Sequence, residues 1–201
     1  MECRELYFEE FDAALEFLAK FHAQLPIFKE LGLDENNFRN YFKPYLEEAL
    51  NKEFALGIFD NEKIVAVAIA EDNFNKNHKF PDNQKILKKL QYHSLLMKKA
   101  YDNPVMDVLA EDKLKLFHLS FLAFDEETIT DATLAELFSE YLDITEKTAF
   151  NYLLVDCYSH EIKASLQSLN FIRVNSFSLN KQTGFKDLDE DEKLEVWLRE
   201  I

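Results

Sequence analysis

The stretch "LSFLAFDEETITDATLAELFSEYL", residues 119–142, contains an apolar run, a short acidic and polar segment, and then an amphipathic run. This order predicts a strand, a loop and a helix. Such a joint can bind a phosphate through the backbone amides that open the helix. Here the loop has no glycine, which would let the backbone approach an anion closely, and no basic residue. The stretch therefore predicts a strand-to-helix joint with impaired phosphate chemistry.

The patterns on either side of this stretch predict a sheet covered by helices. Residues 54–72 contain two β-rich runs joined by a polar turn, as in a hairpin, and the second run is apolar on both faces, as in a central strand. Further strands are predicted at 4–8, 113–124, 151–159, 171–179 and 193–201, and helices at 10–23, 33–52, 85–101, 131–150 and 160–170. This order indicates a mixed sheet of about six or seven strands in the α/β or α+β class.

Local signals also predict where the first helices begin and end. Pro26 ends the first helix, because proline cannot continue it. Asp34 is a suitable N-cap for the next helical segment. Pro44, inside that segment, predicts either a break between two helices or a first-turn residue.

The bulk composition predicts one folded domain over residues 1–201. Hydrophobic residues make up 47% of the chain, and no repeat or linker divides it. Glycine is scarce, with three residues in all. Sites that wrap backbone amides around an anion are therefore poorly supported.

The net charge of −15 argues against nucleic acid as a partner. The chain has 38 acidic and 23 basic side chains and no basic stripe that could release counterions from a phosphate backbone. The same field attracts amines and repels polyanions, including nucleotide cofactors. A simpler interpretation, that the charge keeps an aromatic-rich protein in solution, remains open.

Other compositional signals point to the cytoplasm. Cys3 and Cys157 do not form a disulfide framework, and the acidic N-terminus lacks the order of a signal peptide. No apolar run approaches the ~20 residues that span a bilayer, so no membrane partner is expected. The histidines outside the predicted strands have no metal-site spacing, so no metal is expected.

Four segments together carry a family resemblance: "FLAKFHAQLPIFKELGL" (17–33), "FALGIFDNEKIVAVAIAED" (54–72), "HLSFLAFDEE" (118–127) and "LLVDCYSHEIKASLQSLNFIRV" (153–174). They resemble the GNAT N-acetyltransferase superfamily, and within it the arylalkylamine N-acetyltransferase-like branch. They follow the order of the first helix, the second and third strands, the fourth strand, and the fifth strand with its helix. Residues 73–112 would be a helical insertion where that branch carries an extra helix.

The resemblance implies transfer of an acetyl group from acetyl-CoA to a small amine, aromatic amines included. The fourth strand would bulge away from the fifth and expose backbone groups to the thioester and pantetheine arm. Leu122, Ala123 and Phe124 would contact the arm. The cofactor-binding residues at the start of the following helix would be Thr130, Asp131 and Ala132.

Several residues depart from the family pattern. In the phosphate-binding turn, Ile129 stands at the basic position, and Ala132 and Leu134 stand at the two glycines. Four acidic side chains surround the turn: Asp125, Glu126, Glu127 and Asp131. Further along, Leu166 stands at the family's tyrosine acid, Asn170 at a glycine, and Leu25 at an acidic residue. The acetyl-CoA pyrophosphate loop is therefore degenerate.

The candidate catalytic residues are His118, Ser120 and Tyr158. His118 and Ser120 lie two residues apart on a predicted strand, hence on one face, so His118 could relay a proton through a water held by Ser120. Alternatively, His118 is a half-buried strand histidine with a backbone partner. Tyr158 or Ser165 could replace the missing tyrosine acid. Aromatic residues at helical spacing within 8–45 form either an amine pocket or part of the core.

Three hypotheses about function follow. In the first, the chain is an active N-acetyltransferase that uses acetyl-CoA. In the second, it is a pseudoenzyme that keeps the scaffold as a binding or interaction module. In the third, it is a ligand-binding α/β domain unrelated to acyl transfer, which would show no separation between the strands near Leu119 and Leu153.

Overall fold

The computed structural model describes residues 1–72, 99, 101–102, 105–107, 116–158, 162–179 and 192–201. Most of the predicted helix at 85–101 and most of the predicted insertion at 73–112 lie outside these residues. Among the described residues, none of the helices combines the length and the apolar character that a membrane crossing requires.

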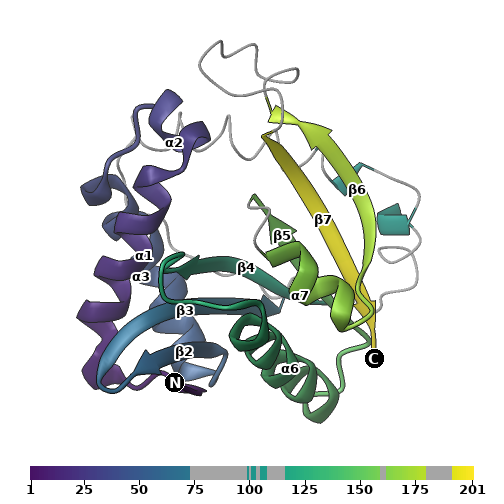
Figure 1. Cartoon of the computed structure of the whole chain (residues 1–201), viewed down its shortest axis with the longest axis horizontal. Helices are drawn as coiled ribbons and strands as arrows, with labels where there is room; N and C mark the ends of the chain where they lie inside the picture. Colours follow the sequence, from purple (N-terminus) through teal and green to yellow (C-terminus); the bar gives the residue numbers. More distant parts are fainter. Residues whose placement is uncertain (73–98, 100, 103–104, 108–115, 159–161, 180–191) are drawn as a thin grey trace.

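A seven-stranded mixed sheet forms the centre of the fold (Figure 1), in the order β1-β2-β3-β4-β5-β7-β6. Neighbouring strands are antiparallel except for β4 and β5, which are parallel. The strands are β1 Glu2–Glu5, β2 Ala55–Asp60, β3 Lys63–Asp72, β4 Leu116–Phe124, β5 Tyr152–Cys157, β6 Ile172–Ser178 and β7 Lys193–Glu200. The predicted fold class and the predicted hairpin at 54–72 are confirmed.

Helices cover both faces of the sheet (Figure 1). Within the described ranges the helices are α1 Phe11–Gln24, α2 Pro26–Glu30, α3 Glu35–Asn51, α6 Asp131–Lys147 and α7 Ile162–Ser168, with a 3-10 turn, η1, at Phe8–Glu10. On one face, α1 and α3 bury a core against Val67, Ile69 and Leu116. On the other, α6 and α7 bury a core against Ala68, Phe117 and Leu119. The alternation of these strand residues between the two cores follows from the two-residue period of a strand.

The helix that contains Pro44 continues without a break. Proline removes one backbone donor and disfavours the helical conformation of the residue before it. Here Phe42, Tyr45 and Leu46, on either side of the proline, are buried in the core. Packing of this apolar face holds α3 together. Of the one or two helices expected over 33–52, a single helix is therefore correct, and a break or a first-turn proline at Pro44 is wrong.

Two predicted boundaries also differ from the structure. The strand expected at 4–8 is β1 at Glu2–Glu5, because Tyr7 opens η1 and its amide donates to Glu10. The helix expected at 131–150 ends at Lys147, and Ala149 takes a positive φ of 58°. A left-handed residue of this kind ends an α-helix.

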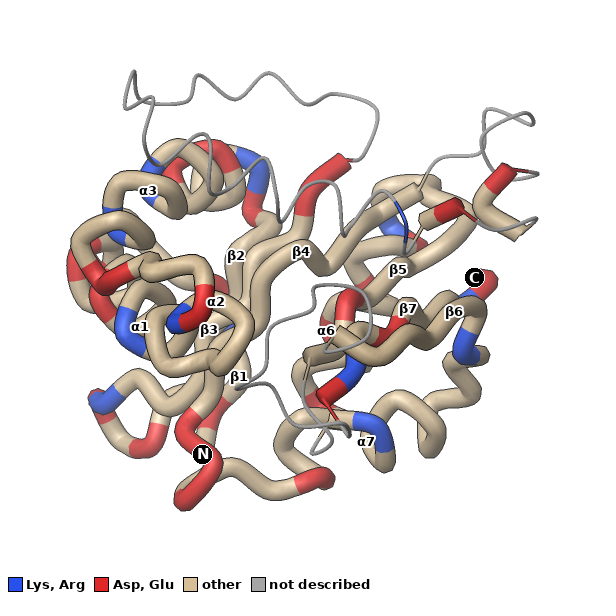
Figure 2. Tube along the Cα trace, turned by 90° about the horizontal axis from the view of Figure 1, so that it is seen from above, with Lys and Arg blue, Asp and Glu red and all other residues tan. Residues whose placement is uncertain are grey.

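Acidic and basic residues are interspersed along the chain trace (Figure 2). Within the part of the chain that the structure describes, no continuous basic stripe appears.

Replacing Asp34 by alanine tests how α3 begins. The Asp34 side chain accepts a hydrogen bond of 2.8 Å from the Asn37 amide at the helix N-terminus. Asp34→Ala is expected to lower the free energy of unfolding by about 1 kcal/mol, measured by urea denaturation. Asn36→Ala, an exposed neighbour in the same turn, is the matched control. Equal effects of the two substitutions would contradict the capping role.

Candidate active site

Strands β4 and β5 separate part-way along their length. Their parallel pairing runs from Leu116 with Tyr152 to Leu119 with Val155. Beyond this point β4 remains paired with β3, and β5 remains paired with β7. Figure 1 shows the two strands heading in different directions. The separation expected from the sequence is therefore present, which removes the basis for the third hypothesis.

A β-bulge in β4 lies at the same point. The register with β3 passes from Leu119 opposite Ala70 to Phe121 opposite Ile69, so Ser120 has no partner residue on β3. The extra residue bends the strand and changes which face the later side chains occupy. As a result, Ser120 and Phe121 both lie on the face covered by α1 and α3.

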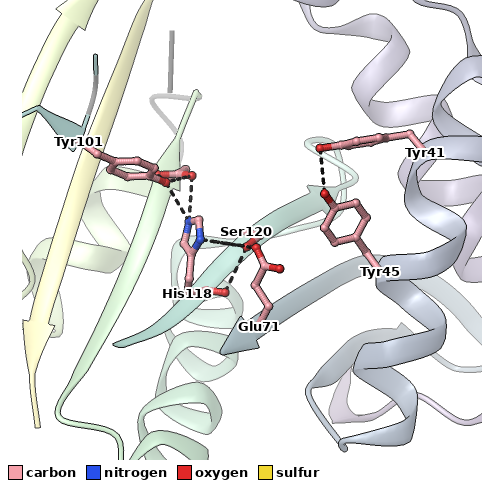
Figure 3. A network of polar contacts seen from close by, with 7 residues as sticks. Tyr41, Tyr45, Glu71, Tyr101, His118 and Ser120 are labelled. Atoms are coloured by element: carbon pink, nitrogen blue, oxygen red, sulfur yellow. Dashed lines mark hydrogen bonds and ion pairs between the residues drawn. The ribbon is translucent and has the colours of Figure 1, made fainter. Parts of the chain in front are cut away.

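A network of buried polar side chains surrounds the bulge (Figure 3). The His118 Nε2 atom lies 2.9 Å from Asp156 Oδ2 and 3.1 Å from the Tyr101 hydroxyl, which donates to Asp156. On the other side of the ring, Nδ1 lies 3.0 Å from Ser120 Oγ. Ser120 in turn donates to Glu71 Oε1 at 2.5 Å. The network thus joins the end of β3, the bulge of β4 and the end of β5.

The carboxylates and the histidine of the network are largely removed from solvent, whereas Ser120 and Tyr101 are partly exposed. The side chains of Asp156, His118 and Glu71 are 5%, 6% and 11% exposed. Burial of a carboxylate is costly unless hydrogen bonds replace its water, and Asp156 accepts from both Tyr101 and His118. Burial, with a further contribution from Asp156, raises the pKa of Tyr101 well above its ordinary value, so this phenol keeps its proton and remains a donor.

The hydrogen-bond pattern defines where a proton can be held. Ser120 has a single hydroxyl hydrogen but lies within bonding distance of both Glu71 and His118. If both carboxylates are ionised and His118 is neutral, the hydroxyl satisfies one of these two acceptors and leaves the other able to take a proton. Once a proton arrives, His118 donates to Asp156 and Ser120, and Ser120 donates to Glu71. The arrangement can therefore accept one proton at the bulge.

Two tyrosines of α3 face this network. The hydroxyls of Tyr41 and Tyr45 lie 3.4 Å apart and point toward the side of the sheet that carries Glu71 (Figure 3). Burial raises the pKa of Tyr41 to about 12, and Glu71 contributes to the shift. Burial, with contributions from Tyr41 and Glu71, also raises the pKa of Tyr45. Both phenols are therefore neutral at physiological pH.

The structure brings two of the three predicted catalytic residues into contact. His118 and Ser120 bond directly, so a water between them is not required. The alternative of a half-buried His118 with a backbone partner is wrong, because the ring is buried and bonds to side chains. Tyr158 follows β5 two residues after Asp156. Burial, together with Asp156 and Tyr41, raises the pKa of Tyr158 well above its usual value.

The predicted cofactor-binding residues lie in two places. Leu122, Ala123 and Phe124 follow the bulge on β4, past the last pair with β5, and pair with β3. Thr130 caps α6, where its hydroxyl accepts from the Thr133 amide at 3.3 Å. The remaining two, Asp131 and Ala132, form the exposed first turn of α6.

The structure also locates the residues that depart from the family pattern. Leu166 is fully buried in α7, and Ser165 donates its hydroxyl to the carbonyl of Asp131 at 2.9 Å. Ser165 therefore ties α7 to α6. Asn170 takes a positive φ of 58°, a conformation that asparagine tolerates better than most residues, so it keeps the backbone that a glycine would have.

Sequence reasoning missed Glu71, Tyr101 and Asp156. Asp156 offered a signal, since it is an ionisable residue within the apolar strand "YLLVDC", where a buried charge requires a partner. Glu71 follows a long apolar run and gave a weaker signal. Among the described residues, no group of three histidine, cysteine, aspartate or glutamate side chains is placed to hold a metal ion.

Comparison with known proteins identifies the fold. No protein-family model and no curated protein sequence matches the chain. Among solved structures, the C-terminal condensation domain of Ebony in complex with beta-alanyl-dopamine matches with a TM-score of 0.78 at 13% identity, covering 100% of this chain and 98% of that one. A putative arylalkylamine N-acetyltransferase 7 from the yellow fever mosquito matches with a TM-score of 0.75 at 12% identity, covering 98% and 86%.

A third solved structure, a mosquito arylalkylamine N-acetyltransferase like 5b, matches with a TM-score of 0.73 at 16% identity, covering 100% of this chain and 99% of that one. Identities this low show the fold alone. The chain has the GNAT acyltransferase fold, as the sequence predicted, and it is similar in structure to arylalkylamine N-acetyltransferases.

Removing the Asp156 carboxylate tests the network as a structural unit. Asp156→Ala leaves the Tyr101 hydroxyl and the His118 Nε2 atom without their acceptor in a buried site. We expect the free energy of unfolding to fall by about 3 kcal/mol in urea denaturation. Asp143→Ala, an exposed change on α6, should shift it by less than about 0.5 kcal/mol. A similar small shift for Asp156→Ala would show that the network does not form.

Proposed function

We propose that this chain transfers an acyl group from the thioester of acetyl-CoA to a small amine. The observation that carries the proposal is the coincidence of three features at Ser120. There β4 ceases to pair with β5, the bulge occurs, and the buried network with His118 reaches the separating strand. A cleavable thioester lying along β4 would therefore meet a proton acceptor where the backbone is no longer engaged by β5.

Glu71 is the residue that would receive the amine. Its carboxylate lies beside Ser120, on the side of the sheet toward which the hydroxyls of Tyr41 and Tyr45 point (Figure 3). A buried carboxylate next to aromatic rings favours an ammonium group, through charge and through the electron-rich ring faces. Similar structures include an agmatine N-acetyltransferase as well as arylalkylamine enzymes, which supports an amine substrate.

Ser120 and His118 would remove the proton that the ammonium must lose before its nitrogen can attack. The Ser120 hydroxyl takes that proton as it passes its own to His118 Nδ1. Asp156 holds the opposite nitrogen, Nε2, and stabilises the charged ring that results. The neutral amine nitrogen then forms a bond to the carbonyl carbon, and the carbon-sulfur bond breaks as the thiolate leaves. The nitrogen also loses a second proton, which balances the proton that the thiolate takes up.

Tyr158 is the residue that would return a proton to the departing sulfur. Leu166 cannot do so, and Ser165 is bonded to the Asp131 carbonyl. The raised pKa of Tyr158 keeps its hydroxyl protonated at neutral pH, so a proton is available. Its position two residues after Asp156 places it at the end of β5, on the other side of the separation from β4.

A second candidate function, a catalytically inactive binding module on the same scaffold, is favoured by one observation. The turn before α6 is acidic and contains no glycine, so the nucleotide of acetyl-CoA has no favourable site there. Measuring acetylated amine distinguishes the two functions, because the inactive module would form none.

Turnover of acetyl-CoA with a panel of amines tests the enzyme function and the role of His118. Wild-type protein should release thiol and form acetylated amine, detected by a thiol reagent and by mass spectrometry. His118→Gln should lower kcat on the order of 10²-fold to 10⁴-fold with a small change in the KM for the amine. Ser139→Ala, which removes a serine hydroxyl in α6, should leave kcat unchanged. No product from wild-type protein with any amine would support the binding module.

The amine KM tests Glu71. Glu71→Gln removes the negative charge but keeps a hydrogen-bond acceptor for Ser120, so the KM for the amine should rise about tenfold or more while the KM for acetyl-CoA changes little. Glu62→Gln, an exposed change in the turn between β2 and β3, is the matched control. An unchanged amine KM would reject Glu71 as the ammonium site.

A further inference from the structure

Backbone amides in the turn between β4 and α6, residues 125–130, already form hydrogen bonds within the turn. Asp125 accepts from the Glu127 amide through its side chain at 3.2 Å. Its backbone carbonyl accepts from the amides of Thr128 and Ile129 at 3.0 and 2.9 Å. A phosphate that used these three amides would first have to break the bonds that shape the turn.

The first turn of α6 is also engaged from within. The Thr133 amide donates to the Thr130 hydroxyl, and the Leu134 amide donates to the Thr130 carbonyl. The carbonyl of Asp131 accepts from Ser165 on α7, which holds this end of the helix in place. The helix N-terminus therefore retains its partial positive charge, and the amides that these bonds leave open to an anion precede Thr133, where Asp131 adds a negative charge.

The charges around the turn act against a polyphosphate. Asp125, Glu126, Glu127 and Asp131 are all acidic, and the cation that reaches Asp125, Lys63, lies 3.8 Å from its carboxylate. The pyrophosphate and 3′-phosphate of CoA carry several negative charges of their own. Because the acidic side chains are at least partly exposed, their repulsion is screened by salt rather than abolished.

The part of β4 that would contact the pantetheine arm differs from this turn both in its backbone hydrogen bonding and in its charge. In the described residues, β4 has no strand partner on its β5 side after Leu119, while β5 stays paired with β7 on its other side. The side chains that follow the bulge, Phe121 to Phe124, carry no charge. Main-chain groups on this edge can bind the amides of a pantetheine arm without any glycine cradle.

We propose, on the basis of the proposed function, that this chain recognises its acyl donor by the thioester and the pantetheine arm alone. The nucleotide of CoA contributes nothing to binding and is repelled by the turn before α6. The donor class is therefore a pantetheine thioester, with or without a nucleotide attached.

Binding of pantetheine and of CoA to the wild-type chain, measured by calorimetry, tests the inference directly. At about 0.15 M salt the two Kd values should agree within about threefold. At about 0.02 M salt CoA should bind at least about threefold more weakly than pantetheine, because the Debye length grows and the repulsion is less screened. CoA binding thirtyfold tighter than pantetheine would overturn the inference, and so would the absence of binding by either compound at millimolar concentration.

A charge reversal in the turn separates this repulsion from a general charge effect. Glu127→Lys should tighten CoA binding about fivefold and leave pantetheine binding unchanged. Glu146→Lys makes the same change in charge near the other end of α6, more than about 20 Å away, and should affect neither compound at 0.15 M salt. An identical response of CoA binding to both variants would overturn the role of the turn.

A comparison of acetyl-CoA with S-acetyl-pantetheine as acyl donors distinguishes this inference from the proposed function. Equal kcat/KM values for acetyl-CoA and S-acetyl-pantetheine support both. Equal binding of CoA and pantetheine without acyl transfer supports donor recognition by the arm and contradicts the enzyme function. Transfer from acetyl-CoA with a kcat/KM at least thirtyfold above that of S-acetyl-pantetheine supports the enzyme function and overturns the inference.

Discussion

The short parallel pairing between β4 and β5 is the constraint on which the candidate site depends. The pairing ends at Leu119 and Val155, and the next residue of β4, Ser120, is the extra residue of a bulge. If β4 continued through Ser120 as a regular strand, Phe121 would lie on the same face as Leu119, toward α6, instead of facing α3. One inserted position thus sets the direction of the strand and the placement of Ser120 beside Glu71 and His118.

The buried network is costly to build, which argues that it has a use beyond stability. Folding removes two carboxylates and a histidine from water. Replacing such buried groups by apolar side chains often stabilises a protein. Each group depends on a partner from another segment, since Glu71, His118 and Asp156 lie on three different strands. The network therefore forms only when the sheet is complete, with its proton-accepting end at the bulge.

The two ends of the proposed donor path differ in their electrostatics. Near the bulge, buried polar groups and tyrosines suit an amine and a thioester carbonyl. Before α6, acidic side chains and satisfied amides suit neither a pyrophosphate nor any other polyanion. The GNAT fold does not decide between these outcomes, because the same scaffold supports any chemistry that its loops and strand ends provide.

The sequence by itself determined the order of the strands and helices and the acidic, glycine-free turn, because apolar periodicity and residue type are local properties. It also placed His118 and Ser120 on one face. Only the tertiary structure decided that α3 runs through Pro44, that Ser120 bulges, and that Asp156 reaches His118 from 38 positions away. Those outcomes depend on core packing and on strand pairing between distant segments, neither of which leaves a periodic signal along the chain.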